Sequence, residues 1–186
     1  MWLIDQLKSV DVSEVATAGN FSLRKGVIMI NCQFNLDDTF GSCGARGSIA
    51  SDGAGAISIY NVLELMGKKT ELDDVIRILR KHHILSFTGK LRRWRVRRAL
   101  KCFGIDSKYK GRFKAYSQIG EKNRFIIFYR SGVFPFYFVH CQAGRLVKDK
   151  NNQIWIELFN PFHRYNSITQ FKKFEDIKVV YLYSIK

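Results

Sequence analysis

The period of the hydrophobic pattern changes near Gly104, and this change constrains the fold more than any other feature. Before Gly104, apolar residues recur at helical spacing. The predicted helices cover about 56–66, a segment that begins near Asp73 and Asp74 after Thr70, and about 90–103. After Gly104, β-branched and aromatic runs alternate with polar turns, which is typical of strands. The predicted strands cover about 125–129, 134–141, 154–159 and 179–184.

The order of these elements predicts an α+β fold, because helices precede a continuous series of strands. We expect a helical half at about 54–104 and a mainly antiparallel sheet at about 125–185. Residues 34–55 are rich in Gly, Ser and Asp, which favour turns, so we predict a loop there. The predicted organisation is an N-terminal extension and loop over 1–50, followed by a single domain over 51–186.

Composition excludes several classes of protein. A hydrophobic content of 46% argues against wholesale disorder, and no apolar run approaches the ~18 residues of a transmembrane helix. The N-terminal residues lack the basic segment and long apolar core of a secretory signal, so we expect a cytoplasmic protein. The four cysteines form no C-x-x-C pair, so we expect no metal site and no cofactor.

The sign of the charge is unusual, since 31 Lys and Arg residues face 16 Asp and Glu residues and give a net charge of +15. Basic residues gather over 90–114, where Asp106 is the acidic residue and aromatic residues interleave. One face of the predicted third helix carries Arg92, Arg93, Arg95, Arg97, Arg98 and Lys101. Such a face suits a nucleic acid, because cations follow phosphates while rings stack on bases. It suits an acidic peptide or an anionic membrane surface equally well.

Residues 52–61 read DGAGAISIYN and open the first predicted helix, which ends at Gly67. The basic segment 89–105 follows, and an Asn160-Pro161 pair comes after a later strand. This series resembles the papain-like cysteine peptidases of the C39-like group over roughly 52–161. In that family a Cys-Gly pair, preceded by Asp or Gly, opens the main helix. The helix dipole and free backbone N–H groups there lower the thiol pKa and stabilise an oxyanion.

The resemblance retains the frame of the family but not its reactive groups. Ala54 stands at the nucleophile position, and Asn160 stands at the position that orients the catalytic His. Pairing the strand 136–143 against 154–161 puts Phe136 at the His position. Another register would make His140 the base, because His140 lies on the same face of a regular strand as Phe136. Ser48 stands where such chains often have a Gln that helps to form the oxyanion hole.

A second Cys-Gly pair begins at Cys43, but it precedes a predicted loop, where no helix dipole would activate the thiol. The resemblance therefore predicts a catalytically inactive pseudopeptidase that binds a peptide segment in a cleft beside Ala54. The residues expected to line that cleft are Ser48, Asp52, Gly53 and Gly55. Since related peptidases work with peptide exporters, the resemblance implies a leader peptide as ligand and an export or processing protein as partner.

Two alternatives remain open from the sequence. The first is an active cysteine peptidase, represented by a Cys-to-Ala variant at position 54, with His140 as base and Asn160 orienting it. The second is a nucleic-acid-binding module that uses the basic segment 90–114.

Overall fold

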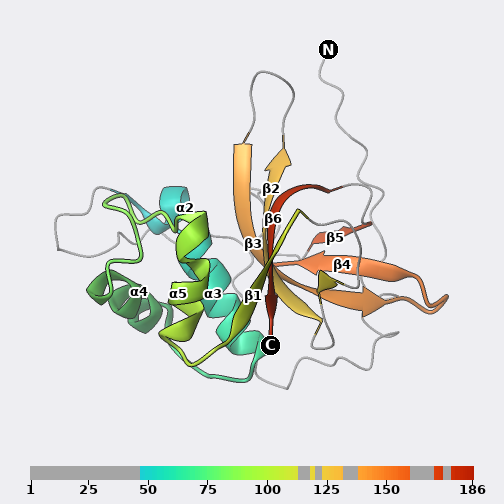
Figure 1. Cartoon of the computed structure of the whole chain (residues 1–186), viewed down its shortest axis with the longest axis horizontal. Coiled ribbons are helices and arrows are strands. Elements are labelled where there is room, and N and C mark those ends of the chain that lie inside the picture. The colour runs from blue at the N-terminus through green and yellow to red at the C-terminus, as the bar shows by residue number, and fades with distance from the viewer. Residues whose placement is uncertain (1–46, 113–117, 120–122, 132–137, 160–169, 174–176) are drawn as a thin grey trace, which may run out of the picture.

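The structure is a computed structural model that describes residues 47–112, 118–119, 123–131, 138–159, 170–173 and 177–186. Its helices come first in the chain and its strands follow, so the predicted α+β class is confirmed. The helices are α2 (Ile49–Asp52), α3 (Ala54–Leu65), α4 (Leu72–Lys81), the 3₁₀ helix η2 (Arg93–Arg95) and α5 (Val96–Lys101). They lie together on one side of the sheet (Figure 1).

The strands form a six-stranded sheet in which every pair of neighbours is antiparallel. They are β1 (Ser107–Gly111), β2 (Arg124–Ser131), β3 (Phe138–Lys148), β4 (Ile154–Leu158), β5 (Gln170–Lys172) and β6 (Lys178–Ile185). Their spatial order is β1-β6-β2-β3-β4-β5, so the last strand of the chain lies between β1 and β2. The short strands β1 and β5 lie at the two edges of the sheet.

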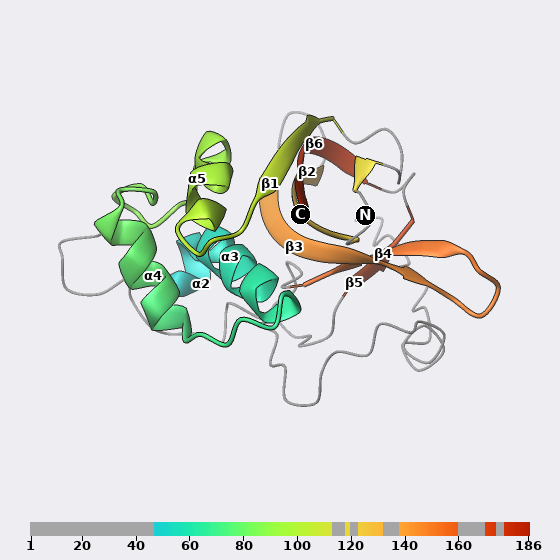
Figure 2. The same cartoon turned by 60° about the horizontal axis from the view of Figure 1, so that its bottom comes forward.

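Alternation along β2 gives the sheet two buried faces. Ile126 and Phe128 pack into the larger core, which includes α3, α4 and α5. Phe125, Ile127 and Tyr129 point the other way, into a second core with residues of β3, β4 and β6. We call the first side the helix face and the second the far face. Figure 2 shows α3 beside β3, and α5 beside β1, on the helix face.

Helix α3 is buried from Gly55 to Leu65, as its apolar sequence predicts. It comes close to the turn that precedes η2, because a Cβ at Gly55 would overlap Leu91 Cβ. Gly55 therefore serves close packing between the helix and that turn. A similar approach holds β2 to β3, where a Cβ at Gly144 would overlap the ring of Phe125.

The predicted loop over 34–55 is wrong in its last part, because residues 49–52 form α2. The Ser48 side chain caps this helix and Ile49 is buried in the core on the helix face. Serine and aspartate suit a helix start as well as a turn, which explains the error. The folded domain thus includes Ile49, two residues before the predicted boundary at 51.

Strands β1 and β5 were not predicted, and the helix predicted over 90–103 is shorter than expected. Strand β1 reads SKYKG and β5 has three residues; both lie at edges of the sheet and lack a β-branched run. Residues 90–92 lie outside the helix, since Leu91 bridges to Leu85 and Lys90 closes a turn with Ser86. In the part of the chain that the structure describes, no helix is long and apolar enough to cross a bilayer.

Candidate functional site

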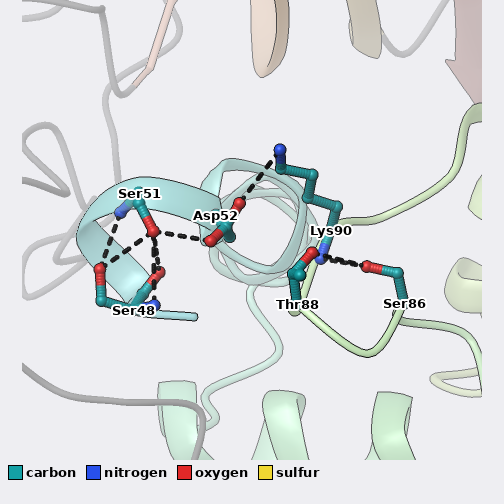
Figure 3. A network of polar contacts seen from close by, with 6 residues as sticks. All are labelled: Ser48, Ser51, Asp52, Ser86, Thr88 and Lys90. Carbon is teal, nitrogen blue, oxygen red and sulfur yellow. Dashed lines mark hydrogen bonds and ion pairs between the residues drawn. The ribbon is translucent and has the colours of Figure 1, made fainter. Parts of the chain in front are cut away.

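The first turn of α3 begins at Ala54, directly after α2 and its polar network (Figure 3). Ser48 and Ser51 form a capping box at α2, and Ser51 Oγ donates to Asp52 Oδ2 over 2.6 Å. Asp52 Oδ1 also lies 3.3 Å from Lys90 Nζ, and the Asp52 side chain is 13% exposed. These contacts tie the start of α3 to the turn before η2. Ser48 and Asp52, predicted to bind peptide, thus have a structural task at the border of the site.

The turn on the other side of this network is held by its own side chains. Ser86 Oγ and Thr88 Oγ1 lie 3.1 Å apart, and the Lys90 backbone N–H donates to Ser86 Oγ over 3.0 Å. Lys90 therefore meets Asp52 from a closed turn rather than from a free loop (Figure 3). Ala54 is half-buried. Its position is set by α2, which directly precedes it, and by the turn 86–90, which is distant in sequence.

Ser58 attaches the first turns of α3 to strand β3. Its Oγ lies 2.6 Å from the Ala54 carbonyl oxygen and 3.0 Å from the Cys141 carbonyl oxygen. At the other end of α3, Met66 Sδ accepts a hydrogen bond of 3.0 Å from Arg124, which lies opposite Arg145 in β3. Helix and strand therefore run in the same direction, and Ala54 lies toward the start of β3.

Val139 is an exposed apolar residue toward this end of the helix. Val139 lies two residues before Cys141, so it shares the helix face of β3. Val139 is 60% exposed, whereas Cys141 and Ala143 on the same face are buried. The four residues from Ser58 back to Ala54 span about 6 Å along the helix axis. The two residues from Cys141 back to Val139 span nearly the same length along the strand. Ala54 and Val139 thus lie toward the same end of α3 and β3.

Neither His140 nor Cys141 provides peptidase chemistry at Ala54. Burial raises the pKa of the Cys141 thiol to about 12, so this thiol stays protonated and is a poor nucleophile. His140 points to the far face, because it lies opposite Tyr129 with ring centroids 5.0 Å apart. Burial, and then the charge of Lys172, lower the pKa of His140. The structure does not bring His140 and Ala54 together.

The strand pairing used to choose the His position is wrong. Ile154 lies opposite Lys148, whereas the assumed pairing placed it opposite Ala143. The difference arises because β3 continues through residues 142–148, whose Gln, Gly and charged residues do not resemble a strand in sequence. Phe136 and Asn160 lie outside the residues that the structure describes.

The six cationic residues of the basic face fall into different environments. Arg95 donates to the carbonyl oxygens of His83 and Ile84 and so supports the end of α4. Arg92 lies over the ring of Trp94, 5.5 Å from its centroid. Arg98 and Lys101 are exposed on α5. Among the described residues, none of the six forms an ion pair.

Arg93 and Arg97 line a pocket of about 340 Å³ between the helices and the edge of the sheet. Its other lining residues are Trp94, Tyr109, Tyr181 and Tyr183. The sequence interpretation placed the two arginines on the basic face and noted aromatic residues in the segment 90–114, but it missed Tyr181 and Tyr183. Their signal was the alternation in the VVYLYS run, which puts both rings on one face of a strand.

Neither protein-family models nor curated proteins match this chain. In the described residues, no group of three or more His, Cys, Asp or Glu side chains could hold a metal ion.

Proposed function

We propose that this chain has a papain-like fold of the C39-like type, and that it is a pseudopeptidase that binds a peptide segment beside Ala54. One observation carries the proposal: Ala54 opens a buried helix whose first turns are hydrogen-bonded, through Ser58, to a central strand of an antiparallel sheet. A helix start set against a strand is where a papain-like peptidase needs its nucleophile. Here the position holds a methyl group, which leaves a surface for binding without chemistry.

The surroundings of Ala54 support binding rather than hydrolysis. A peptide needs exposed apolar surface beside backbone groups, and Val139 supplies such surface at the start of β3. Hydrolysis needs a base within hydrogen-bond reach of the nucleophile. His140 does not meet this condition, since it packs against Tyr129 on the far face. The proposal therefore favours a leader or other peptide segment as ligand, presented to a separate export or processing protein.

The test is a positional-scanning library of fluorescent ten-residue peptides, measured by anisotropy against the full chain. We expect a preferred subset to bind with Kd values in the micromolar range. Two variants then locate the site: Ala54→Leu places bulk at the first turn of α3, and Val139→Lys places a charge on the exposed surface. Each should weaken binding at least tenfold.

Val139→Thr is the matched control, because it keeps the shape of the side chain and should retain most of the affinity. Thermal unfolding of each variant checks that the fold is kept. The proposal fails if no library peptide binds below about 1 mM, or if folded Ala54→Leu and Val139→Lys proteins both bind peptides like the unmodified chain.

A further inference from the structure

The pocket formed by Arg93, Trp94, Arg97, Tyr109, Tyr181 and Tyr183 has no part in the contacts at Ala54. We call it the arginine–tyrosine pocket. Its volume of about 340 Å³ lies at the lower end of the range for ligand sites, so it fits one side chain or a small molecule. Its lining holds two guanidinium groups and four aromatic rings, and no carboxylate.

The charges of the pocket are not neutralised by the described part of the protein. Arg93 and Arg97 are four residues apart, one helical turn, where like charges repel each other. Arg97 forms no hydrogen bond or ion pair with any described residue. An anion between the two guanidinium groups would remove this repulsion. The pocket therefore selects for negative charge.

Arg93 is already held in position before any ligand arrives. Its guanidinium lies 4.2 Å from the centroid of the Tyr181 ring and donates to the Tyr181 hydroxyl. The Tyr183 hydroxyl in turn donates to the Arg93 carbonyl oxygen over 2.7 Å. A fixed planar guanidinium is well suited to bidentate recognition of a carboxylate, because little side-chain freedom is lost on binding.

The position of the pocket relates it to Ala54. Cys141 lies opposite Phe128, and Phe128 lies opposite Tyr181, so these three residues form a row across β3, β2 and β6 on the helix face. Ser58 joins the Ala54 turn to the Cys141 end of this row. The two ends are two strand spacings apart, or about 10 Å. Cys141 and Phe128 are buried, so this spacing gives the separation of the two places and not the path of a peptide. An extended peptide of that length has about three residues.

We infer that the arginine–tyrosine pocket binds the carboxylate of an Asp or Glu side chain in the peptide, about three residues from the residue beside Ala54. This inference rests on the proposed function and makes the ligand an acidic peptide. Trp94 and Tyr109 line the same pocket and are exposed, so their rings can contact the methylene groups of the acidic side chain. The excess positive charge of the chain draws such a ligand toward this side.

A nucleic acid is the competing ligand. A single strand requires cations along successive phosphates. The pocket instead is lined by two arginines, and Arg95 of the same basic face donates to backbone carbonyls. These observations favour the peptide, and the experiment below includes an oligonucleotide.

The experiment scans one Glu through each position of a ten-residue peptide from the library subset, with a matched Gln series, in 150 mM salt. We expect a Glu peptide to bind about tenfold tighter than its Gln counterpart at one position. Arg97→Gln should abolish this Glu preference while the Gln peptide binds as before. Arg97→Lys should keep part of the preference, and Lys148→Gln, the same charge change at the end of β3, should keep all of it.

The outcomes separate this inference from the proposed function. If peptides bind without a preference for Glu, the acidic-residue inference is overturned and peptide binding stands. The same holds if the Glu preference persists in Arg97→Gln. Failure of all peptides overturns both. A twelve-residue oligothymidylate that binds tightly, with a salt dependence reduced in Arg97→Gln, overturns the inference in favour of a nucleic acid when the Glu preference is also absent.

Discussion

Ser58 Oγ lies 3.0 Å from the carbonyl oxygen of Cys141, 83 residues further along the chain, and 2.6 Å from the carbonyl oxygen of Ala54. One buried hydroxyl thus sets the start of α3 against a central strand. The link consists of a hydroxyl and two backbone carbonyl oxygens, so no group in it titrates near neutral pH and its geometry does not change with pH there. The proposed binding surface depends on this link for its shape.

Ser58→Ala should lower the free energy of unfolding by about 1 kcal/mol, since the buried Cys141 carbonyl loses a partner. Urea denaturation measures the change. Thr70→Ala is the control, because Thr70 forms no hydrogen bond with the described residues and should cost less than about 0.5 kcal/mol. Equal losses in the two variants would show that Ser58 does not fix the helix to the strand.

Glu157→Gln should cost about 3–5 kcal/mol of unfolding free energy, because it removes the buried carboxylate that neutralises Arg145. Glu157 is 6% exposed and forms an ion pair with Arg145, which lies opposite Arg124. Arg124, Arg145 and Glu157 form a row across β2, β3 and β4 that holds two cations and one carboxylate. Burial, and then the charge of Arg145, lower the pKa of Arg124. The double variant with Arg145→Met should be more stable than Glu157→Gln alone. A double variant that is less stable would contradict this description of the row.

Stability should fall between about pH 9 and pH 12. Burial raises the pKa of the Cys141 thiol from 9.0 to about 12, and burial, then Tyr109, raise the pKa of Tyr183 from 10.0 to about 12. In this range the unfolded chain loses protons that the folded chain keeps, so unfolding becomes more favourable as pH rises. Below pH 9 both states keep these protons and the effect vanishes.

Urea unfolding at pH 8 and pH 10.5 measures this dependence. Between these values Cys141 alone should account for about 2 kcal/mol. Cys141→Ala should therefore lose less stability over the interval than the unmodified chain. A variant with the same loss would mean that Cys141 ionises alike in both states.

Ala54→Cys should not gain peptidase activity, because the candidate base His140 points away from the helix that carries the new thiol. His140 packs on Tyr129 at the far face of the sheet. An internally quenched peptide library measures hydrolysis, with Ala54→Ser as the matched control. Hydrolysis by Ala54→Cys that is lost on adding His140→Ala would instead support an active peptidase with His140 as base.

The sequence predicted elements whose hydrophobic period is strong. Helix α3 and strands β2 and β6 were found because long apolar or aromatic runs leave little choice of structure. Strand β1 was missed because its pairing with β6, rather than its own composition, makes it a strand. Propensity is a weak guide at such an edge.

The candidate site was predictable only where local sequence determines it. The position of Ala54 at the start of a helix followed from the motif around it. The direction of the His140 side chain depends on the register of β3 with its neighbours, and a shift of one residue moves a side chain to the other face. The arginine–tyrosine pocket joins residues 93 and 181, whose contact arises from the insertion of β6 between β1 and β2.

Photo-crosslinking tests the central claim, peptide binding beside Ala54, most directly. A library peptide that binds the full chain carries benzoylphenylalanine at successive positions, and mass spectrometry identifies the linked residues. We predict crosslinks to 51–54, where α2 ends and α3 begins, and to 138–139 at the start of β3, which Ala54→Leu should abolish. Crosslinks confined to β4, β5 or the far face of the sheet would contradict the claim.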